Sequence, residues 1–102
     1  MIKPTVGRVV WYTPYQSDTF AYTPGQPLAA IVTAVWSDTC VNLAVFDANG
    51  NSHGRTSVLL WQDDGDNPKP DCGFCEWMPY QKGQAARTEQ LESAMKEGNG
   101  AQ

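Results

Sequence analysis

The residues with the most chemical potential are a Cys-x-x-Cys pair, Cys72 and Cys75, and a single histidine, His53. A structural zinc site needs four ligands, and Cys40 with His53 could complete such a set, although no spacing demands it. A thioredoxin-like redox pair requires a βαβ context, which the flanking sequence lacks. Partly buried free thiols or one disulfide are the better interpretation, so we expect no metal and no cofactor.

His53 and Arg55 are two positions apart, so a strand would place both side chains on one face. The pair could hold an anion such as a phosphate, with the guanidinium as a bidentate donor. Arg8 is a third candidate partner for a phosphate. The alternative is that these are ordinary solvent-facing side chains.

No catalytic motif is present in the chain. The sequence has no G-x-S-x-G, no Walker loop, no H-E-x-x-H and no glycine-rich dinucleotide fingerprint. A serine or cysteine nucleophile would depend on the lone His53 as its base. The acidic residues Asp63, Asp64 and Asp66 lack the spacing and the closing glutamate of a calcium loop. We therefore expect a protein that is not an enzyme.

Aromatic side chains exceed what a core of this size needs. The chain has four Trp, four Tyr and three Phe, and each can bury about 150–250 Å². Core packing is the default role of each one alone, but exposed Trp and Tyr are typical of binding faces. The candidate ligand-binding residues are Arg8, Trp11, Tyr12, His53, Arg55, Trp61 and Trp77.

Length and charge exclude several classes of protein. The 102 residues, 41% of them apolar, suit one domain. A net charge of −4 without any basic run argues against binding to a nucleic acid polymer. No apolar stretch approaches the ~18 residues of a membrane span, and the first residues do not read as a signal peptide. Three cysteines do not make a secreted disulfide framework, so a cytosolic protein is expected.

Short strands are the elements that must position these residues. Segment 27–62 contains three apolar runs, 28–36, 40–46 and 53–61, which predict a β-meander. The first run is almost continuously apolar, as in a strand buried on both faces, and Asn49-Gly50 predicts a tight turn. Further strands are expected at 4–13 and 74–80.

Two connections are long. Segment 13–27 contains Tyr15, Phe20 and Tyr22, which we expect to fold back over the core as a lid, with a short strand at 20–22 as an alternative. Segment 62–73 is rich in Asp, Gly and Pro and is expected to be an exposed loop.

The predicted fold is all-β. We expect a small SH3-like or OB-like barrel of about five strands, followed by a short C-terminal helix or a disordered tail. The barrel domain spans residues 1–82 and the tail spans 83–102, where 87–97 has helix-forming composition. Unpaired edge strands of such a barrel favour a homo-oligomer.

The two ends of the barrel segment carry a signature. The opening matches K-P-x-V-G-R-(I/V)-V-H-Y at Lys3, Pro4, Val6, Gly7, Arg8, Val9, Val10 and Tyr12, with Trp11 in place of the usual His. The closing segment matches G-T-W-H-W-P at Gly73, Trp77 and Pro79, with Cys75 and Glu76 where Trp and His are usual. Residues 3–80 thus resemble a group of small accessory proteins encoded in tailed-phage genomes and prophages.

The resemblance implies an accessory protein in the cytoplasm of a host bacterium. Together with the aromatic surplus, it leads us to expect a non-enzymatic binding protein for host takeover or counter-defence that sequesters a small anionic ligand or nucleotide. Two alternatives stay open: a protein–protein inhibitor of a host enzyme, and a minor virion or structural protein.

Overall fold

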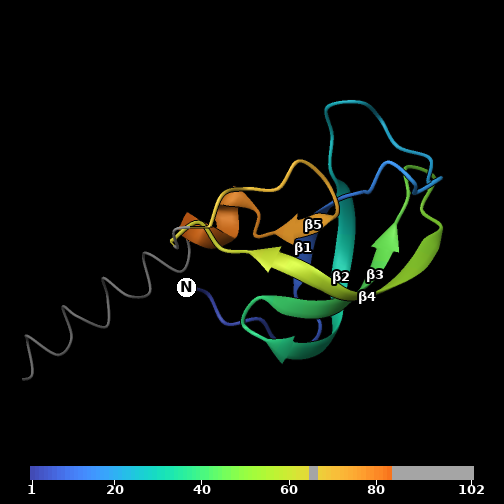
Figure 1. The fold of residues 1–102 in the computed structure, drawn as a ribbon. Coiled ribbons are helices and arrows are strands. Elements are labelled where there is room, and N and C mark those ends of the chain that lie inside the picture. Colours follow the sequence, from blue (N-terminus) through green and yellow to red (C-terminus); the bar gives the residue numbers. More distant parts are fainter. Residues whose placement is uncertain (65–66, 84–102) are drawn as a thin grey trace, which may run out of the picture.

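The protein folds as a closed barrel of five strands. The computed structural model describes residues 1–64 and 67–83. The strands are β1 (Val9–Thr13), β2 (Leu28–Ser37), β3 (Cys40–Phe46), β4 (Ser52–Trp61) and β5 (Phe74–Glu76). Each strand is bonded to the next in chain order, and β5 closes on β1 (Figure 1). The prediction of a small all-β barrel is confirmed.

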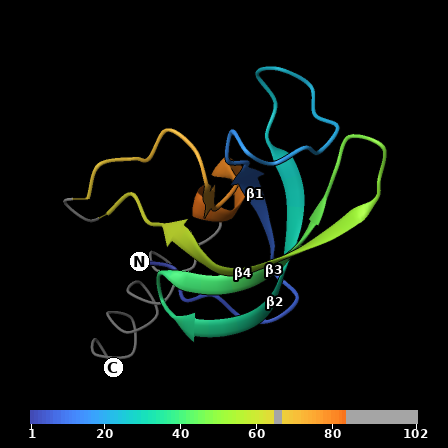
Figure 2. The same cartoon turned by 45° about the vertical axis from the view of Figure 1, so that its right-hand side comes forward.

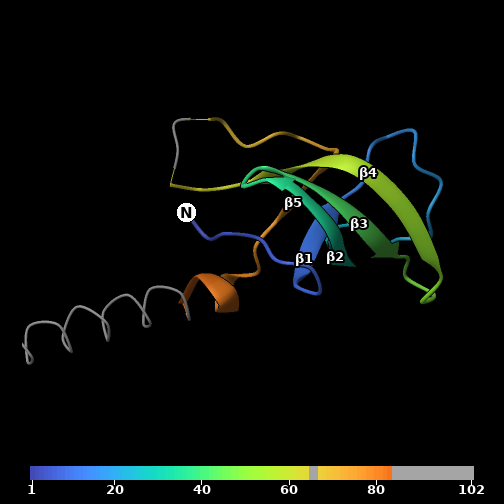
Figure 3. The same cartoon turned by 90° about the horizontal axis from the view of Figure 1, so that it is seen from below.

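The strand order separates the two barrel types that the sequence left open. β1 to β4 form an antiparallel meander, and β5 then lies antiparallel to β1 and parallel to β4. An OB barrel has a Greek-key order, which this sequential arrangement does not have. Figures 2 and 3 show β2, β3 and β4 as one curved sheet, with the short β1 and β5 completing the barrel.

β2 differs from its prediction. Its buried residues, Leu28, Ala30 and Val32, alternate with exposed Ala29 and Thr33. The expectation of a strand buried on both faces was wrong, because a barrel made of one sheet has a single interior. β3 follows the predicted alternation over its full length.

The β3–β4 turn is confirmed and is built by two residues. Gly50 has φ of +85°, which suits glycine. Asp47 accepts hydrogen bonds on Oδ1 from the backbone N–H groups of Asn49 and Asn51, at 2.9 and 3.0 Å. The carboxylate therefore closes the turn together with the Asn-Gly pair.

The first and last strands are shorter than expected. β1 begins only at Val9, because Gly7 has φ of +94° and its N–H donates to the carbonyl of Val32. β5 ends at Glu76, and residues 79–83 are helical instead of extended. Pro79 suits the first helical position, and the Gln81 side chain accepts the backbone N–H of Met78, as in a capping box.

A short helix at 79–83 follows the barrel, as the fold prediction expected, but it begins before the tail 83–102 in which that helix was placed. The helix-forming segment 87–97 and the tail from residue 84 lie outside the described residues. No helix in the described part of the chain is long and apolar enough to cross a membrane.

The core fills the barrel with inward-facing side chains from all five strands and from both flanks. Its largest fully buried members include Trp77, Tyr12, Leu43 and Leu60. Phe20 enters the same core from the connection between β1 and β2. Within residues 1–64 and 67–83, the buried indole N–H of Trp77 has no hydrogen-bond partner, an arrangement that costs about 1–3 kcal/mol.

Candidate functional site

An open cleft lies between the loop 14–27, which joins β1 to β2, and the outer face of β1 and β5. We call it the loop cleft. Its volume is about 470 Å³, within the range of roughly 300–1,000 Å³ that ligand sites occupy. Its apolar lining consists of three aromatic residues and two prolines: Trp11, Tyr15, Tyr22, Pro14 and Pro27.

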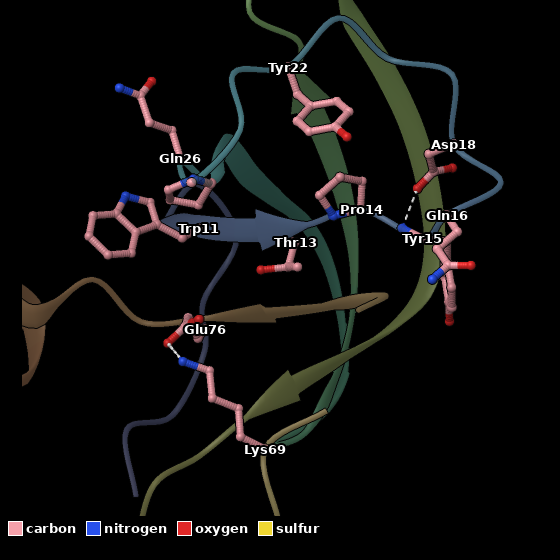
Figure 4. A pocket seen from close by; sticks show the side chains of 12 residues that line it. Trp11, Thr13, Pro14, Tyr15, Gln16, Asp18, Tyr22, Gln26, Lys69 and Glu76 are labelled. Carbon is pink, nitrogen blue, oxygen red and sulfur yellow. Dashed lines mark hydrogen bonds and ion pairs between the residues drawn. The ribbon is translucent and has the colours of Figure 1, made fainter. Parts of the chain in front are cut away.

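The floor of the loop cleft follows from the register of β1 and β5. Trp11 is paired with Glu76, whereas the next pair, Tyr12 and Cys75, is buried. Because alternate residues of a strand point to opposite faces, Trp11 and Glu76 lie side by side on the outer face. Figure 4 shows Gln26 above Trp11 and Glu76 below it, with Tyr22 farther along the cleft, above Pro14.

A single carboxylate holds the loop in place. Asp18 accepts hydrogen bonds on Oδ2 from the Tyr12 hydroxyl at 3.0 Å and from the Tyr15 backbone N–H at 2.9 Å. Its Oδ1 accepts from Nη2 of Arg55, also at 2.9 Å. The Asp18 side chain is only 9% exposed. Three donors on three different segments thus converge on one partly desolvated anion.

These contacts change the acidity of both partners. Burial alone would raise the pKa of Asp18, but the hydrogen bonds from Arg55, Tyr12 and the Tyr15 backbone outweigh it, so that the pKa lies below its ordinary value. Burial, and then the neighbouring Asp18 carboxylate, raise the pKa of Tyr12 far above that of a free phenol. At neutral pH the carboxylate is therefore ionised and the phenol is protonated.

Phe20 is the second anchor of the loop. The Arg55 guanidinium lies 4.4 Å from the centre of its ring, and the His53 ring lies 4.3 Å away at a tilt of 34°. Beside it, the backbone N–H of Ala48 donates to the carbonyl of Ala21, which ties the loop to the β3–β4 turn (Figures 1 and 2).

The prediction that the loop aromatics form a lid was right for one residue only. Phe20 is buried in the core, whereas Tyr15 and Tyr22 are 52% and 56% exposed and line the loop cleft. The alternative of a short strand at 20–22 is wrong, since those residues have no regular structure. The hydroxyl groups of Tyr15 and Tyr22 can form hydrogen bonds with water, whereas the Phe20 ring has no polar group and is more stable when buried.

Tyr15 rests on a glycine. Gly73 has φ of +71°, and a Cβ at this position would overlap the Tyr15 ring. The Gly73 N–H donates to the carbonyl of Thr13 at 2.8 Å. Gly73 therefore lets the Tyr15 ring lie directly on the backbone that leads into β5.

The opposite wall of the loop cleft is formed by Lys69, which makes an ion pair with Glu76. Lys69 Nζ lies 3.0 Å from Oε1 of Glu76, and its side chain is 49% exposed, whereas that of Glu76 is 13% exposed. The same ammonium group lies 5.4 Å from the centre of the Trp61 ring and 5.7 Å from that of Phe74. Lys69 thus lies across the outer face of β4 and β5 (Figure 4).

The predicted site residues do not form one site. Trp11 lines the loop cleft. Tyr12, Arg55 and His53 instead form or adjoin the anchors of the loop. His53 Nε2 lies 2.9 Å from Asp47 Oδ2, and hydrogen bonds from His53 and from the turn backbone hold the pKa of Asp47 below its ordinary value.

The three other predicted residues lie elsewhere. Arg8 is exposed before β1 and donates from Nε to Thr5 Oγ1 at 3.3 Å. Trp61 is half-buried and donates from its indole N–H to the carbonyl of Asn67 at 3.1 Å, and Trp77 belongs to the core. A binding role for any member of this set stays a prediction.

The cysteines are separate free thiols. Among the described residues, no three His, Cys, Asp or Glu side chains meet in a way that could hold a metal ion, so the zinc set with Cys40 and His53 is not assembled. Cys75 donates from Sγ to the carbonyl of Leu59 at 3.4 Å, and burial raises the pKa of its thiol to about 12. Such a thiol is a poor nucleophile at neutral pH.

Several cleft residues were missed by sequence reasoning. Tyr15 and Tyr22 were noticed but were assigned to a lid, and Asp18, Lys69 and Glu76 carried no motif. The one available signal was the density of aromatic and proline residues in 13–27. No family model, curated protein or solved structure matches this chain.

Proposed function

We propose that this protein is a binding protein that acts without catalysis, and that the loop cleft recognises a segment of a partner protein. The observation that carries the proposal is an aromatic and proline-lined cleft whose loop wall, 14–27, is firmly anchored. Aromatic side chains supply contact area at low entropic cost, and a loop wall that is fixed before binding lowers the cost of association further.

The charges in the loop cleft favour a protein segment over an anionic ligand. Its charged lining residues are Asp18, Glu76 and a single lysine, Lys69, which is itself paired with Glu76. The net charge of the chain is −4. A phosphate entering this cleft would meet more negative than positive charge, which opposes its binding.

Sequestration of a small anionic ligand is the second candidate. It is supported by His53 and Arg55, which share one face of β4 and both contact the Phe20 ring. Isothermal titration with cyclic dinucleotides and ADP-ribose derivatives tests this candidate. Binding that Arg55→Lys weakens and Trp11→Ala leaves unchanged would favour it over the partner protein.

In keeping with the resemblance of residues 3–80, the proposed setting is a phage accessory role in a bacterial cytoplasm, where the partner is a host protein. The direct test is affinity capture from bacterial lysate with three variants. Trp11→Ala and Tyr22→Ala should lose the partner, and Trp36→Ala should keep it, because Trp36 is 65% exposed but lies outside the loop cleft. Capture that depends on Trp36 alone would contradict the proposal.

The homo-oligomer was predicted from unpaired strand edges. Closure gives each of the five strands two bonded neighbours, but residues 52–58 of β4 have no partner in β5, so part of this strand edge is still unpaired. The oligomer stays a prediction that light scattering can check. A virion role would require the chain to be present in purified particles, which mass spectrometry detects.

A further inference from the structure

We propose that the loop cleft binds an extended, proline-containing peptide that carries one basic side chain, and that this side chain takes the place of Lys69 on Glu76. The inference rests on the proposed function and names the chemistry of its partner. It depends on three features of the loop cleft: its rings, its polar donors and its ion pair.

The rings suit proline. Trp11, Tyr15 and Tyr22 offer flat apolar faces along an open cleft, and Pro14 and Pro27 stiffen its loop wall. Aromatic-lined grooves are the usual receptors of polyproline II segments, which are extended before they bind and lose little entropy. A helix or a folded surface would not place the rings of successive prolines between the two walls of the loop cleft.

The polar groups suit an extended backbone. A polyproline II segment has no internal hydrogen bonds, so its carbonyl groups need donors. Gln16 and Gln26, whose side chains carry amide donors, are among the residues that line the loop cleft. Within the described chain, the Trp11 indole and the Tyr15 and Tyr22 hydroxyls have no bonded partner, whereas the indoles of Trp36 and Trp61 are already engaged.

The carboxylate in the ion pair of Lys69 and Glu76 suits a cationic side chain of the ligand. Glu76 is mostly buried and lies next to Trp11, so a basic side chain that stacks on the indole can reach its carboxylate. Lys69 occupies this carboxylate in the free protein but is about half exposed. An exposed lysine is weakly held, and an incoming arginine can replace it with a bidentate contact.

This arrangement predicts opposite effects for the two members of the pair. Lys69→Gln removes the internal competitor and should tighten binding of a basic peptide, whereas Glu76→Gln removes the receptor and should weaken it. Each change should be about fivefold in Kd, as expected for a partly exposed ion pair. Lys82→Gln is the matched control, because Lys82 forms an ion pair of similar length with Asp63, 2.9 Å against 3.0 Å, but does not line the loop cleft.

The experiment is a titration of the full chain with three synthetic peptides at low salt. The first peptide consists of proline alone. The second has one proline replaced by arginine, and the third has one proline replaced by glutamate. We expect the arginine peptide to bind tightest, Trp11→Ala to abolish its binding, and Lys82→Gln to leave its affinity within twofold. Circular dichroism of each variant shows whether the barrel is intact.

Three results would overturn the inference: no binding of any proline peptide, equal affinity for the glutamate and arginine peptides, or weaker binding by Lys69→Gln. Its failure can be told apart from that of the proposed function. If lysate capture requires Trp11 and Tyr22 but no proline peptide binds, the cleft is a binding site with a different ligand. If peptides bind but capture ignores these residues, the proposed function fails and the peptide chemistry stands.

Discussion

The two long connections of the barrel form the two walls of one cleft, but they are held by different kinds of contact. The loop 14–27 is anchored by Phe20 in the core and by a mostly buried carboxylate, Asp18, with three donors. The described part of 62–73 is held by polar contacts: the Asn67 carbonyl accepts from the Trp61 indole, and Lys69, which is about half exposed, pairs with Glu76. One wall is thus fixed in the folded core, whereas Lys69 on the other wall is held by contacts that are partly exposed.

Phe20→Ala should cost the most stability, because it removes the core contact of the loop 14–27. A cavity left by a buried phenylalanine costs about 3–5 kcal/mol, which is a large share of the stability of a small domain. Urea unfolding measures the loss. Tyr22→Ala, in the same loop but exposed, should cost less than about 0.5 kcal/mol; equal losses for the two variants would show that Phe20 is not an anchor.

Asp18→Asn should lower the free energy of unfolding by about 1–3 kcal/mol at neutral pH. Since the folded-state pKa of Asp18 is below that of the unfolded chain, the ionised carboxylate stabilises the fold at neutral pH, and this contribution is lost as the pH falls below about 4. The variant should therefore lose less stability than the wild type between about pH 6 and pH 3. Asp38→Asn, at an exposed turn, is the control, and identical acid profiles for both variants would contradict the role of Asp18.

Gly73→Ala should cost about 1–2 kcal/mol from its left-handed backbone alone. It should also displace the Tyr15 ring and weaken whatever the loop cleft binds. Gly54→Ala is the matched control, because a Cβ there meets open space and its φ lies outside the left-handed region. If Gly73→Ala leaves both stability and binding unchanged, Tyr15 is not held as described.

Lys69→Gln should have the smallest effect on stability, less than about 1 kcal/mol, because the ion pair is partly exposed and screened by salt. Denaturant curves at low and high salt measure this difference. A loss of several kcal/mol would mean that the wall at Lys69 is as firmly fixed as the loop 14–27.

Much of the fold could be predicted from the sequence because its signals are local. The alternation in 40–46 gave β3 with its observed bounds, and Asn49-Gly50 marked the next turn. The errors occurred where a local pattern does not decide the outcome. The apolar run of β2 reads the same for one buried face as for two, and only closure of the sheet leaves one interior.

The candidate site was less predictable because it depends on contacts between distant residues. Arg55 and Asp18 are 37 positions apart, so Arg55 was interpreted as a ligand for phosphate rather than as an anchor of a loop. Glu76 lies beside Trp11 only because β5 returns to β1. Of the predicted residues, Trp11 alone lines the loop cleft, and its place there depends on the same closure.

Closure also has a consequence for the order in which the chain folds during synthesis. The meander of β2, β3 and β4 joins strands that are adjacent in sequence, so it can form as soon as residue 61 is free. β1 is synthesised first. Its pairing partner at the seam of the barrel, β5 at residues 74–76, is the last of the strands to leave the ribosome. Translation of almost the whole barrel therefore precedes its final seam, and the loop cleft, whose floor is that seam, is assembled at the end.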